Sequence, residues 1–580
     1  AEPDPEGRCD LSIALADDLR FDEPVDVEVT ITNVGDWAIT EPFDVRLASD
    51  LAEAIDIEGG GLRSIAASHG SPIEPGDRRT VTFARTPRME QEVSRLVATV
   101  DPEDRVVFLG CSAGLAVDLG TGCTLEPAVG DFHLSEEWHF GLLTSDPTSC
   151  ADNPGGPLQV TSVPVVANLT DDNLDGVIDE WDIPEVIFPA YRIPGDYRER
   201  GQLTAIHGDS GELYFQVASP DLLVDSTSNV AVGDLDGDGR PEIVAQRSRH
   251  YDDPGLMAFR NDGTELWRNV EGGGDWLINS GSPAIADLDH DGRPEVVFGR
   301  MVFDGATGAR LATGSADTIG ANGGFGSIPC IADIIPGGNM EVLVGPVLYS
   351  YSGGSSPSLD LEWRAREGGT NVPDGFCAVA DMNADGGPEI VLAAAGRLFL
   401  IDGSGAVLAS VTTAVLSGQT TQGRLGAPAV ADFDNDGELE IAVAGAMSLM
   451  LLEGDLSLRW QFDTEDDSSH ATGATAFDFE GDGKAEVVSI DEHYMRVFDG
   501  ATGDILMEVL NSSRTRTEYP VVADVDGDGN AEIVVAHSNE ASFLYGSAKP
   551  PTSGCGVRAF GDLSDHFVPA PPIWNQHTYH

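Results

Sequence analysis

The chain has 580 residues, of which 98 are acidic and 32 are basic, and its formal net charge at pH 7 is −66. This charge argues against nucleic-acid binding and against docking on anionic membranes, because both need a basic surface. No stretch approaches the roughly 18 apolar residues of a transmembrane helix, so the sequence predicts no membrane span.

Residues 1–118 are predicted to form an immunoglobulin-like β-sandwich. Val25–Asn33 alternates apolar and polar side chains, as a half-buried strand does. Further short strands are predicted at Val45–Leu47, Arg79–Phe83 and Leu96–Asp101. About 110 residues of such strands suit a sandwich.

Three short motifs of this region resemble the CARDB domain, an adhesion-related module of bacterial surface proteins. They are Val-x-Val-x-Val-Thr-Ile-Thr-Asn-Val-Gly from Val25, Ile73–Asp77 and Val97–Pro102. The resemblance implies a spacer or adhesive role and brings no catalytic residue. Cys9 and Cys111 lie in the first and last predicted strands, where a disulfide would join the ends of the sandwich.

Residues 119–162 form a connector to a series of repeats that runs from residue 163 to residue 580. The connector contains Glu136–Phe140, which we expect to form a strand. The last repeat lacks a recognisable fourth strand of its own, so this segment is our candidate for closing the ring of repeats.

One acidic nonamer recurs along the rest of the chain. It reads Asp-x-Asp-x-Asp-Gly-x-x-Glu, and its cleanest copies begin at Asp234 and Asp524. Acids at positions 1, 3, 5 and 9 and a carbonyl at position 7 would form an oxygen cage, and glycine at position 6 permits the sharp turn. Calcium takes about six to eight oxygen ligands, so this cage suits calcium better than magnesium or a transition metal. The alternative, a set of ordinary acidic hairpin turns, leaves the acid at position 9 unexplained.

The spacing of the copies predicts the architecture. They begin at residues 171, 234, 287, 333, 381, 432, 478 and 524, and a period of about 40 to 50 residues is typical of a propeller blade. Each unit has four short apolar or β-branched runs between Gly and Asp turns, which predict strands. The expected fold is therefore all-β, with an eight-bladed β-propeller at residues 163–580. Seven blades are the alternative count, because the units at Asp171 and Asp333 are irregular.

The segment Ala-Asp-x-Asp-x-Asp-Gly-x-x-Glu-Ile-Val resembles the FG-GAP/VCBS repeat of integrin α-chain propellers and bacterial surface proteins. The resemblance implies one calcium ion per intact loop, at the edge of a blade between its first two strands. The ligands that it implies are Asp234, Asp236, Asp238 and Glu242; Asp287, Asp289, Asp291 and Glu295; Asp381, Asn383, Asp385 and Glu389; Asp432, Asp434, Asp436 and Glu440; Asp478, Glu480, Asp482 and Glu486; Asp524, Asp526, Asp528 and Glu532.

Two units depart from this pattern. The unit at Asp333 has Ile335 and Gly337 where acids belong, and we expect no ion there. The first unit is expanded and looks like an EF-hand loop without flanking helices. Its implied ligands are Asp171, Asn173, Asp175, Asp179 and Asp182. About seven calcium ions are therefore expected.

The seven cysteines suit an oxidising compartment. Cys330 and Cys377 occupy matching first-strand positions in neighbouring units, where they could face one another. Cys123 and Cys150 bracket the connector, which leaves Cys555 without a predicted partner. We expect a secreted or surface-exposed bacterial protein. Either the natural chain continues beyond residue 580 or its aromatic tail folds back onto the propeller.

No catalytic motif stands out, and no catalytic residue is assigned. The favoured function is adhesion or extracellular structural assembly, as a filament or matrix subunit. The expected partners are an extracellular protein, a polysaccharide or copies of the chain itself. The alternative is a calcium-dependent polysaccharide lyase or another carbohydrate-active propeller. Its candidate proton-transfer residues would be His250, Tyr251, His493 and Tyr519.

Overall fold

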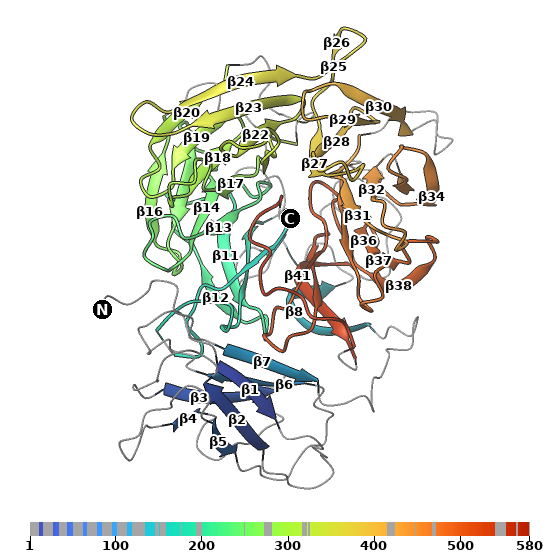
Figure 1. The fold of residues 1–580 in the computed structure, drawn as a ribbon. Helices are drawn as coiled ribbons and strands as arrows, with labels where there is room; N and C mark the ends of the chain where they lie inside the picture. The colour runs from blue at the N-terminus through green and yellow to red at the C-terminus, as the bar shows by residue number, and fades with distance from the viewer. Residues whose placement is uncertain are drawn as a thin grey trace, which may run out of the picture. The chain divides into compact units, whose positions relative to one another are not determined.

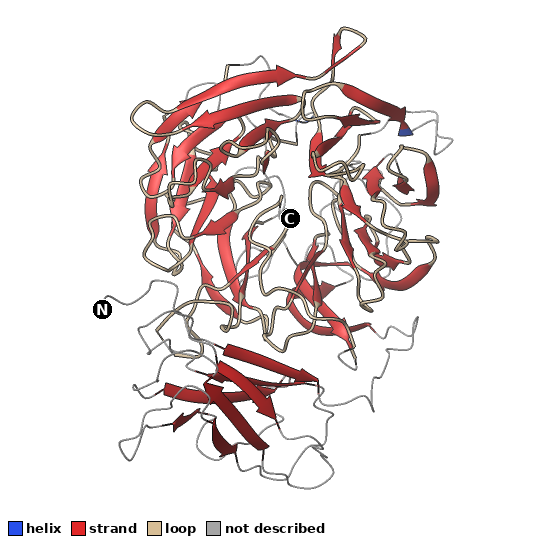
Figure 2. Ribbon diagram, viewed as in Figure 1, coloured by secondary structure: helices blue, strands red, loops and turns tan. Residues whose placement is uncertain are grey.

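A computed structural model gives the fold of two compact units, Ala1–Ala128 and Val129–His580. The structure describes residues 11–15, 27–33, 43–49, 62–65, 78–83, 95–100, 113–118, 134–144, 150, 158–174, 176–192, 200–248, 250–271, 281–315, 322, 325–413, 424–445, 447–466, 471–539, 553–563 and 566–578. All of the named elements in these residues are β-strands, and Figure 2 shows strands in both units. Among the described residues, no helix has the length and apolar character needed to cross a membrane.

The first unit contains two antiparallel sheets. One has the order β1-β2-β5 and the other β4-β3-β6-β7. The strands are β1 (Leu11–Leu15), β2 (Val27–Asn33), β3 (Phe43–Ser49), β4 (Leu62–Ile65), β5 (Arg78–Phe83), β6 (Arg95–Val100) and β7 (Ala113–Asp118). Four of them coincide with the predicted strands, while the immunoglobulin-like assignment stays a prediction. Cys9 and Cys111 lie outside the described residues.

The second unit contains eight four-stranded antiparallel sheets arranged as the blades of a propeller (Figure 1), which confirms the predicted eight-bladed fold. Blade 1 contains β9 (Val165–Ala167), β10 (Glu185–Ala190), β11 (Gln202–His207) and β12 (Leu213–Gln216); blade 2 contains β13 (Ala231–Gly233), β14 (Glu242–Gln246), β15 (Leu256–Phe259) and β16 (Glu265–Asn269); blade 3 contains β17 (Ala284–Ala286), β18 (Glu295–Phe298), β19 (Met301–Asp304) and β20 (Arg310–Thr313); blade 4 contains β21 (Cys330–Ala332), β22 (Glu341–Val344), β23 (Val347–Ser352) and β24 (Ser358–Arg364). A small hairpin, β25 (Arg366–Glu367) and β26 (Thr370–Asn371), follows blade 4.

The remaining blades continue the pattern. Blade 5 contains β27 (Phe376–Ala380), β28 (Glu389–Ala394), β29 (Arg397–Ile401) and β30 (Val407–Thr412); blade 6 contains β31 (Ala429–Ala431), β32 (Glu440–Gly445), β33 (Ser448–Leu452) and β34 (Leu458–Asp463); blade 7 contains β35 (Ala474–Phe477), β36 (Glu486–Ile490), β37 (Tyr494–Phe498) and β38 (Ile505–Leu510); blade 8 contains β39 (Val521–Ala523), β40 (Glu532–His537), β41 (Ser553–Asp562) and β8 (Leu134–Thr144).

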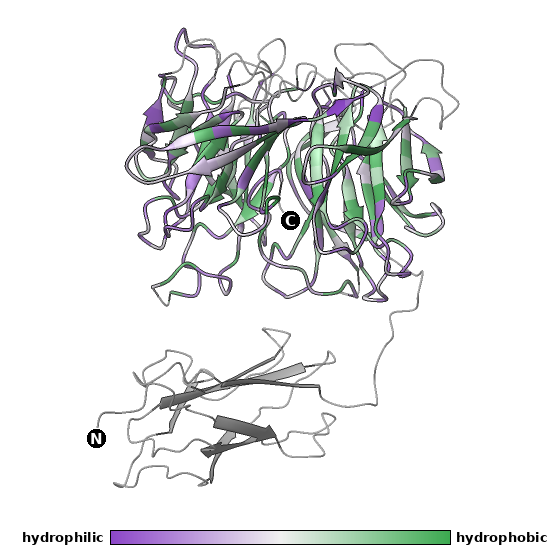
Figure 3. Ribbon diagram, turned by 45° about the horizontal axis from the view of Figure 1, so that its top comes forward, coloured by the Kyte–Doolittle hydropathy of each residue, from purple (hydrophilic) through white to green (hydrophobic). Residues whose placement is uncertain are grey.

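The sequence of each strand reflects its depth in a blade. Blades pack face to face, so the second strands are buried on both sides, as in β14 and β32, where every residue is buried. These strands therefore read as continuous apolar runs without alternation. The fourth strands form the outer edge and are partly exposed, as in β24. Figure 3 shows the same division, with apolar strands inside the blades and polar loops at their ends.

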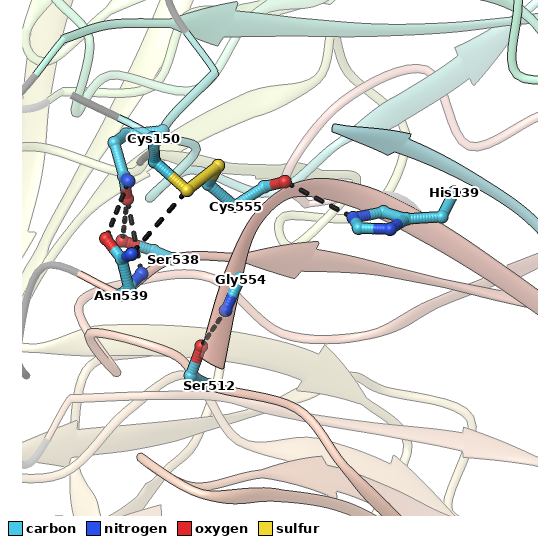
Figure 4. The surroundings of a disulfide bond; sticks show 8 residues. His139, Cys150, Ser512, Ser538, Asn539, Gly554 and Cys555 are labelled. Carbon is cyan, nitrogen blue, oxygen red and sulfur yellow. Dashed lines mark hydrogen bonds between the residues drawn. A yellow bond between two sulfur atoms is a disulfide. The ribbon is translucent and has the colours of Figure 1, made fainter. Parts of the chain in front are cut away.

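The ring closes through a strand from the connector. β8 pairs antiparallel with β41 along its whole length and supplies the fourth strand of blade 8. A disulfide joins Cys150, just after β8, to Cys555 in β41, and His139 Nε2 lies 3.2 Å from the carbonyl oxygen of Cys555 (Figure 4). The expectation that Cys555 lacks a partner and that Cys150 goes with Cys123 was therefore wrong. The two cysteines are 405 residues apart, and only ring closure brings them together.

The Cys330–Cys377 pairing is confirmed. This disulfide joins β21 of blade 4 to β27 of blade 5. The two residues are the first and second of their strands, so short first strands of adjacent blades bring the sulfur atoms within bonding distance. The cross-link lies within the repeats, away from the closure at blade 8.

Removing the closure disulfide is expected to destabilise the propeller. A cross-link between distant residues restricts the unfolded chain, and this one also fixes the connector on β41. We expect Cys150→Ser with Cys555→Ser to lower the free energy of unfolding by about 2–5 kcal/mol. Denaturant unfolding of both proteins in calcium would measure it, with Cys330→Ser and Cys377→Ser as the matched control. An unchanged midpoint would mean that the β8–β41 ladder alone holds the closure.

Four tryptophans on fourth strands make hydrogen bonds across alternate blade interfaces. The indole N–H donates to a glycine carbonyl of the next blade in four pairs: Trp138 to Gly208 (2.5 Å), Trp267 to Gly305 (2.7 Å), Trp363 to Gly403 (3.0 Å) and Trp460 to Gly500 (2.7 Å). A Cβ atom at Gly503, whose φ is +75°, would lie 2.7 Å from the indole of Trp460. The Asp-Gly-Ala-Thr-Gly turns therefore have a packing role between blades, and Trp138 makes the same contact from blade 8 to blade 1.

The C-terminal segment, residues 566–578, crosses the first strands or acidic loops of successive blades. Its contacts are Val568 with Phe479, Pro571 with Asp524, Trp574 with Val166, Asn575 with Val232, Gln576 with Ile285, and Thr578 with Pro329. Tyr519 also donates a hydrogen bond to the carbonyl of His577. In Figure 1 the C-terminal end lies inside the ring of blades. The tail thus packs onto the propeller and lines its centre.

Candidate metal sites in the acidic loops

Each acidic loop of the repeats connects the first strand of a blade to the second. The acid at position 9 is the first residue of the second strand, for example Glu242 in β14 and Glu532 in β40. In blades 2 to 8 its Oε2 accepts the backbone N–H of position 2 at 2.8–3.0 Å. The donors are Leu235, Leu288, Ile334, Met382, Phe433, Phe479 and Val525.

The aspartate at position 1 shapes the turn. Its Oδ2 accepts the backbone N–H of the position-6 glycine at 2.7–3.0 Å in blades 2, 3, 5, 6, 7 and 8. That glycine has a positive φ in all six loops, from +82° to +96°, which is costly for other residues. The loop sequence therefore fixes both the turn and the direction of its carboxylates.

Five loops bring three carboxylates together, with ligand atoms within 4.8 Å of one another. The groups are Asp234, Asp236 and Glu242; Asp287, Asp289 and Asp291; Asp432, Asp434 and Glu440; Asp478, Glu480 and Glu486; Asp524, Asp526 and Glu532. The predicted ligands Asp238, Glu295, Asp436, Asp482 and Asp528 belong to the same loops but lie outside these groups. These acidic clusters can bind a metal ion.

Several carboxylate oxygens in these loops are buried without a protein hydrogen-bond partner. They are Asp289 Oδ1, Asp434 Oδ1, Glu440 Oε1 and Glu480 Oε2. A buried acceptor without a partner is costly, and a cation would supply the missing interaction. The donor set therefore fits a hard, oxygen-seeking metal ion.

The position-9 glutamates are electrostatically strained without a cation. Burial, and then the charges of the neighbouring aspartates, raise the pKa of Glu242, Glu295 and Glu440 to about 7. Burial and nearby acids raise the pKa of Glu486 to about 9 and that of Glu532 to about 11. Clustered carboxylates of this kind favour bound protons or a bound cation.

The residue at position 2 couples each loop to the next blade. Its N–H is held by the position-9 glutamate, and its side chain is buried in the core shared with the following blade. Leu235 packs with Phe298 and Phe303 of blade 3, and Phe433 packs with Val487 and Phe498 of blade 7. A change in the loop's carboxylates therefore reaches the interface between blades.

In the expanded loop of blade 1, the predicted ligands Asp171 and Asp182 also accept backbone hydrogen bonds. Asp171 Oδ2 accepts the N–H of Gly176 (3.0 Å), as position 1 does in the repeats. The two oxygens of buried Asp182 accept the backbone N–H groups of Asp172, Asn173 and Asp179 at 2.9–3.2 Å. Asp175 lies outside the described residues.

Glu185, which the sequence analysis missed, is the counterpart of the position-9 glutamate in blade 1. It begins β10, and its Oε2 accepts the N–H of Leu169 (2.7 Å). Its Oε1 accepts the hydroxyl of Thr170 (2.7 Å) and lies 3.3 Å from His207 Nδ1. The signal was available, since Glu185 precedes a β-branched run as the other seven glutamates do.

Blades 4 and 5 carry altered loops. In blade 4, Glu341 Oε2 accepts the N–H groups of both Ile334 and Ile335 at 2.9 Å. In blade 5, the side-chain amide of Asn383 donates to Glu389 Oε1 (3.0 Å), and its oxygen accepts the N–H of Asp385 (2.8 Å). At positions 1, 3, 5 and 9 these loops carry two carboxylates in blade 4 and three in blade 5, whereas each of the five loops with a cluster carries four.

The four candidate residues of a lyase are spread over three blades, and the side chains of three of them already have polar partners within the protein. Tyr251, between β14 and β15, donates its hydroxyl to the carbonyl of Pro220. His493, between β36 and β37, lies 2.5 Å from Glu465. Burial raises the pKa of Tyr519, next to β39, and its hydroxyl donates to the tail.

Comparison with known proteins agrees with this architecture. A family model of the FG-GAP-like repeat matches residues 234–298, 381–443 and 478–535. The chain is a β-propeller protein that carries FG-GAP-like repeats. A search of the curated proteins finds no match to it.

Two solved structures extend the comparison. The biofilm matrix protein Bap1 of V. cholerae has a TM-score of 0.61 and 20% identity, covering 77% of this chain and 94% of that chain. At this identity the likeness concerns the fold alone. The CARDB domain of a Pyrococcus furiosus protein in complex with di-metal ions covers 19% of this chain and 92% of that chain, with 24% identity and a TM-score of 0.14.

Proposed function

We propose that the chain is a calcium-stabilised β-propeller that acts outside the cell, in adhesion or in extracellular structural assembly as a filament or matrix subunit. The observation that carries this proposal is the repetition of an oxygen-only acidic cluster at the same edge of blade after blade. A catalytic metal ion is needed only in the active site. Cation sites repeated in most blades instead indicate a structural role in stabilising the ring.

Calcium is the ion that the donors favour. The loops offer carboxylate, amide and backbone oxygens in flexible turns, which calcium accepts in numbers that magnesium does not. The proposed ligands are those predicted for the six regular loops, together with the first-blade loop, giving about seven ions. Glu185 is added in blade 1. In each site the ion would cancel the mutual repulsion of several carboxylates and so hold the position-2 residue between blades.

Three observations support the proposed extracellular location. Two disulfides in the propeller suit an oxidising compartment, where free calcium is also high enough to fill sites of modest affinity. A net charge of −66 keeps such a protein soluble. Bap1, which shares the fold, is described as a biofilm matrix protein.

The tail supports a binding or structural role over catalysis in the centre of the ring. Residues 566–578 hydrogen-bond to the first strands of blades 1, 2 and 3, and the C-terminal end lies inside the ring of blades (Figure 1). A polymer substrate could not use that space without displacing the segment. We therefore place the interaction with a protein or polysaccharide partner on the outer surfaces.

Metal analysis and binding assays test the proposal. Purified protein dialysed against buffered calcium is expected to contain several calcium ions per chain by plasma mass spectrometry. It should bind a matrix polysaccharide or self-associate in sedimentation experiments only in calcium. A protein free of calcium, or one that releases unsaturated products from uronate polymers, would contradict the proposal.

The pH dependence of the calcium effect has a defined sign. The pKa of Glu242, Glu295 and Glu440 lies at about 7 in the metal-free fold, against an ordinary value of 4.5. The metal-free folded state therefore binds more protons than the unfolded state between these values, and its stability falls as the pH rises through 7. Calcium binding releases these protons. The rise in Tm caused by calcium should thus grow between pH 5 and pH 8, as measured in paired melts with calcium and with EDTA; a constant difference would contradict it.

A further inference from the structure

The fourth strand of every blade contains a β-bulge at the same place. In each case the pairing with the third strand shifts by one residue, so one residue of the fourth strand has no partner opposite. The bulged residues are Tyr214, Leu266, Leu311, Glu362, Leu408, Arg459, Leu506 and Glu137, in blades 1 to 8 in order. A bulge re-aims a side chain, and a bulge kept in all eight blades points to a common role.

In blade 6 the bulged residue contacts the acidic loop of its own blade. Arg459 Nη2 lies 2.5 Å from Oδ2 of Asp434, the position-3 acid of that loop.

Blade 6 therefore has a built-in cation beside its acidic cluster. Arg459 is anchored from three directions, because Nη1 lies 3.2 Å from Glu453 and Nε donates to the carbonyl of Ala501 in blade 7 (3.1 Å). Its side chain is 24% exposed and that of Asp434 is 15% exposed. A pair so shielded from water is weakly screened. A divalent cation must displace the guanidinium from Asp434 or bind beside its charge.

We propose that the bulged residue of the fourth strand sets the cation affinity of the loop in its own blade. Arg459 makes blade 6 the weakest of the five clustered sites. Leucine in blades 2, 3 and 7 leaves those sites without this competing charge. The proposal rests on the proposed calcium binding and adds that the blade 6 site fills last.

The main test is the calcium-binding curve of Arg459→Leu, which installs the residue found in four other blades. Calcium bound per chain would be measured by equilibrium dialysis across a series of buffered free-calcium concentrations. In the wild-type curve, one calcium ion should bind at a higher free-calcium concentration than the others, which we call the late step. In Arg459→Leu that step should move to about 10-fold to 100-fold lower free calcium, the range typical of residues that contact metal ligands.

Three control variants separate charge, site and structure. Arg459→Lys keeps the positive charge and should keep the late step. Asp432→Ala combined with Arg459→Leu removes the blade 6 site. The number of calcium ions bound per chain should therefore fall by one, and no additional ion should bind at low free calcium. Leu266→Arg should create a second late step by weakening blade 2. Melts in EDTA report whether Arg459→Leu changes the fold itself.

The outcomes separate this inference from the proposed function. If wild-type protein binds calcium and Arg459→Leu gives the same curve, the inference is overturned and the proposed function stands. The inference is also overturned if the step that Arg459→Leu moves to lower free calcium is still present when Asp432→Ala is added. If the wild-type protein binds no calcium, both fail together. A step that shifts with Arg459→Leu but not with Arg459→Lys supports the inference.

Discussion

Removing calcium with EDTA is expected to lower the Tm of the propeller by about 10 °C or more. At free calcium tenfold above the dissociation constant, one site adds about 1.4 kcal/mol to the free energy of unfolding. Seven sites would add roughly 10 kcal/mol, which is comparable to the whole stability of an ordinary domain. For a unit of about 450 residues, an unfolding entropy near 2.1 cal/mol/K per residue converts each kcal/mol into roughly 1 °C.

The size of this effect follows from the way the loops are built into the ring. The carboxylates that repel one another also hold the position-2 residue through the position-9 glutamate, as Glu440 holds Phe433. Without a cation, repulsion within the loop opposes the packing of Phe433 between blades 6 and 7. Loss of the ions should therefore loosen interfaces all around the ring.

Differential scanning calorimetry in calcium, in magnesium and in EDTA would measure the shift. Magnesium at equal concentration is the control for ionic strength and should restore little of the loss, because it demands a stricter geometry. Equal Tm values in calcium and EDTA would contradict structural calcium.

The repeat units were predictable because local sequence determines them. The acidic loop carries its own turn residues and its own hydrogen-bond acceptors, and the apolar runs beside it form buried strands wherever two blades meet. Positions 1, 6 and 9 thus keep the same hydrogen bonds in the loop that begins at Asp234 and in the loop that begins at Asp524, 290 residues later. The period then gives the number of blades.

The features that local sequence did not predict depend on contacts between distant segments. β41 (Ser553–Asp562) is rich in glycine and has little apolar character, yet it is the third strand of blade 8 because β8 and β40 pair with it. A Cβ at Gly556 would lie 1.7 Å from the carbonyl oxygen of Phe140 in β8, so glycine is required there by the partner strand. Cys150 and Cys555 meet for the same reason.

The first blade shows a different limit. The prediction took Asp182 as the acid at position 12 of an EF-hand-like loop. Glu185, the first residue of β10, lies further from Asp171 than the position-9 glutamates lie from their first aspartates, so the spacing of the repeat did not point to it. In the structure Asp182 accepts backbone N–H groups of the inserted loop, whereas Glu185 keeps the bond to Leu169.

Replacing Asp524 is expected to have a far larger effect than replacing Asp333. Asp524 is 6% exposed and accepts the N–H groups of Gly527 (2.7 Å) and Gly529 (3.0 Å). Its own N–H is bonded to Pro571 of the C-terminal segment (3.2 Å). Asp524→Ala therefore removes a predicted ligand, leaves backbone donors unpaired and weakens an anchor of the tail. In calcium we expect a loss of about 2–4 kcal/mol.

Asp333→Ala provides the matched control at the same position of blade 4. Asp333 is exposed, and Glu341 continues to hold the loop through Ile334 and Ile335. We expect a change within about 0.5 kcal/mol, as for surface substitutions away from special features. Both variants would be unfolded with denaturant in calcium and in EDTA.

The comparison in EDTA identifies the origin of the difference. Burial and the charges of Asp526 and Asp528 raise the pKa of Asp524 to about 7 in the metal-free fold, so removing its carboxylate also relieves repulsion there. The loss caused by Asp524→Ala should therefore be much smaller in EDTA than in calcium, and hydrogen exchange should place the added opening in β39, β40 and residues 566–578. A loss of the same size in both buffers would assign Asp524 a hydrogen-bonding role alone, and equal losses for Asp524→Ala and Asp333→Ala would contradict the distinction between blades 8 and 4.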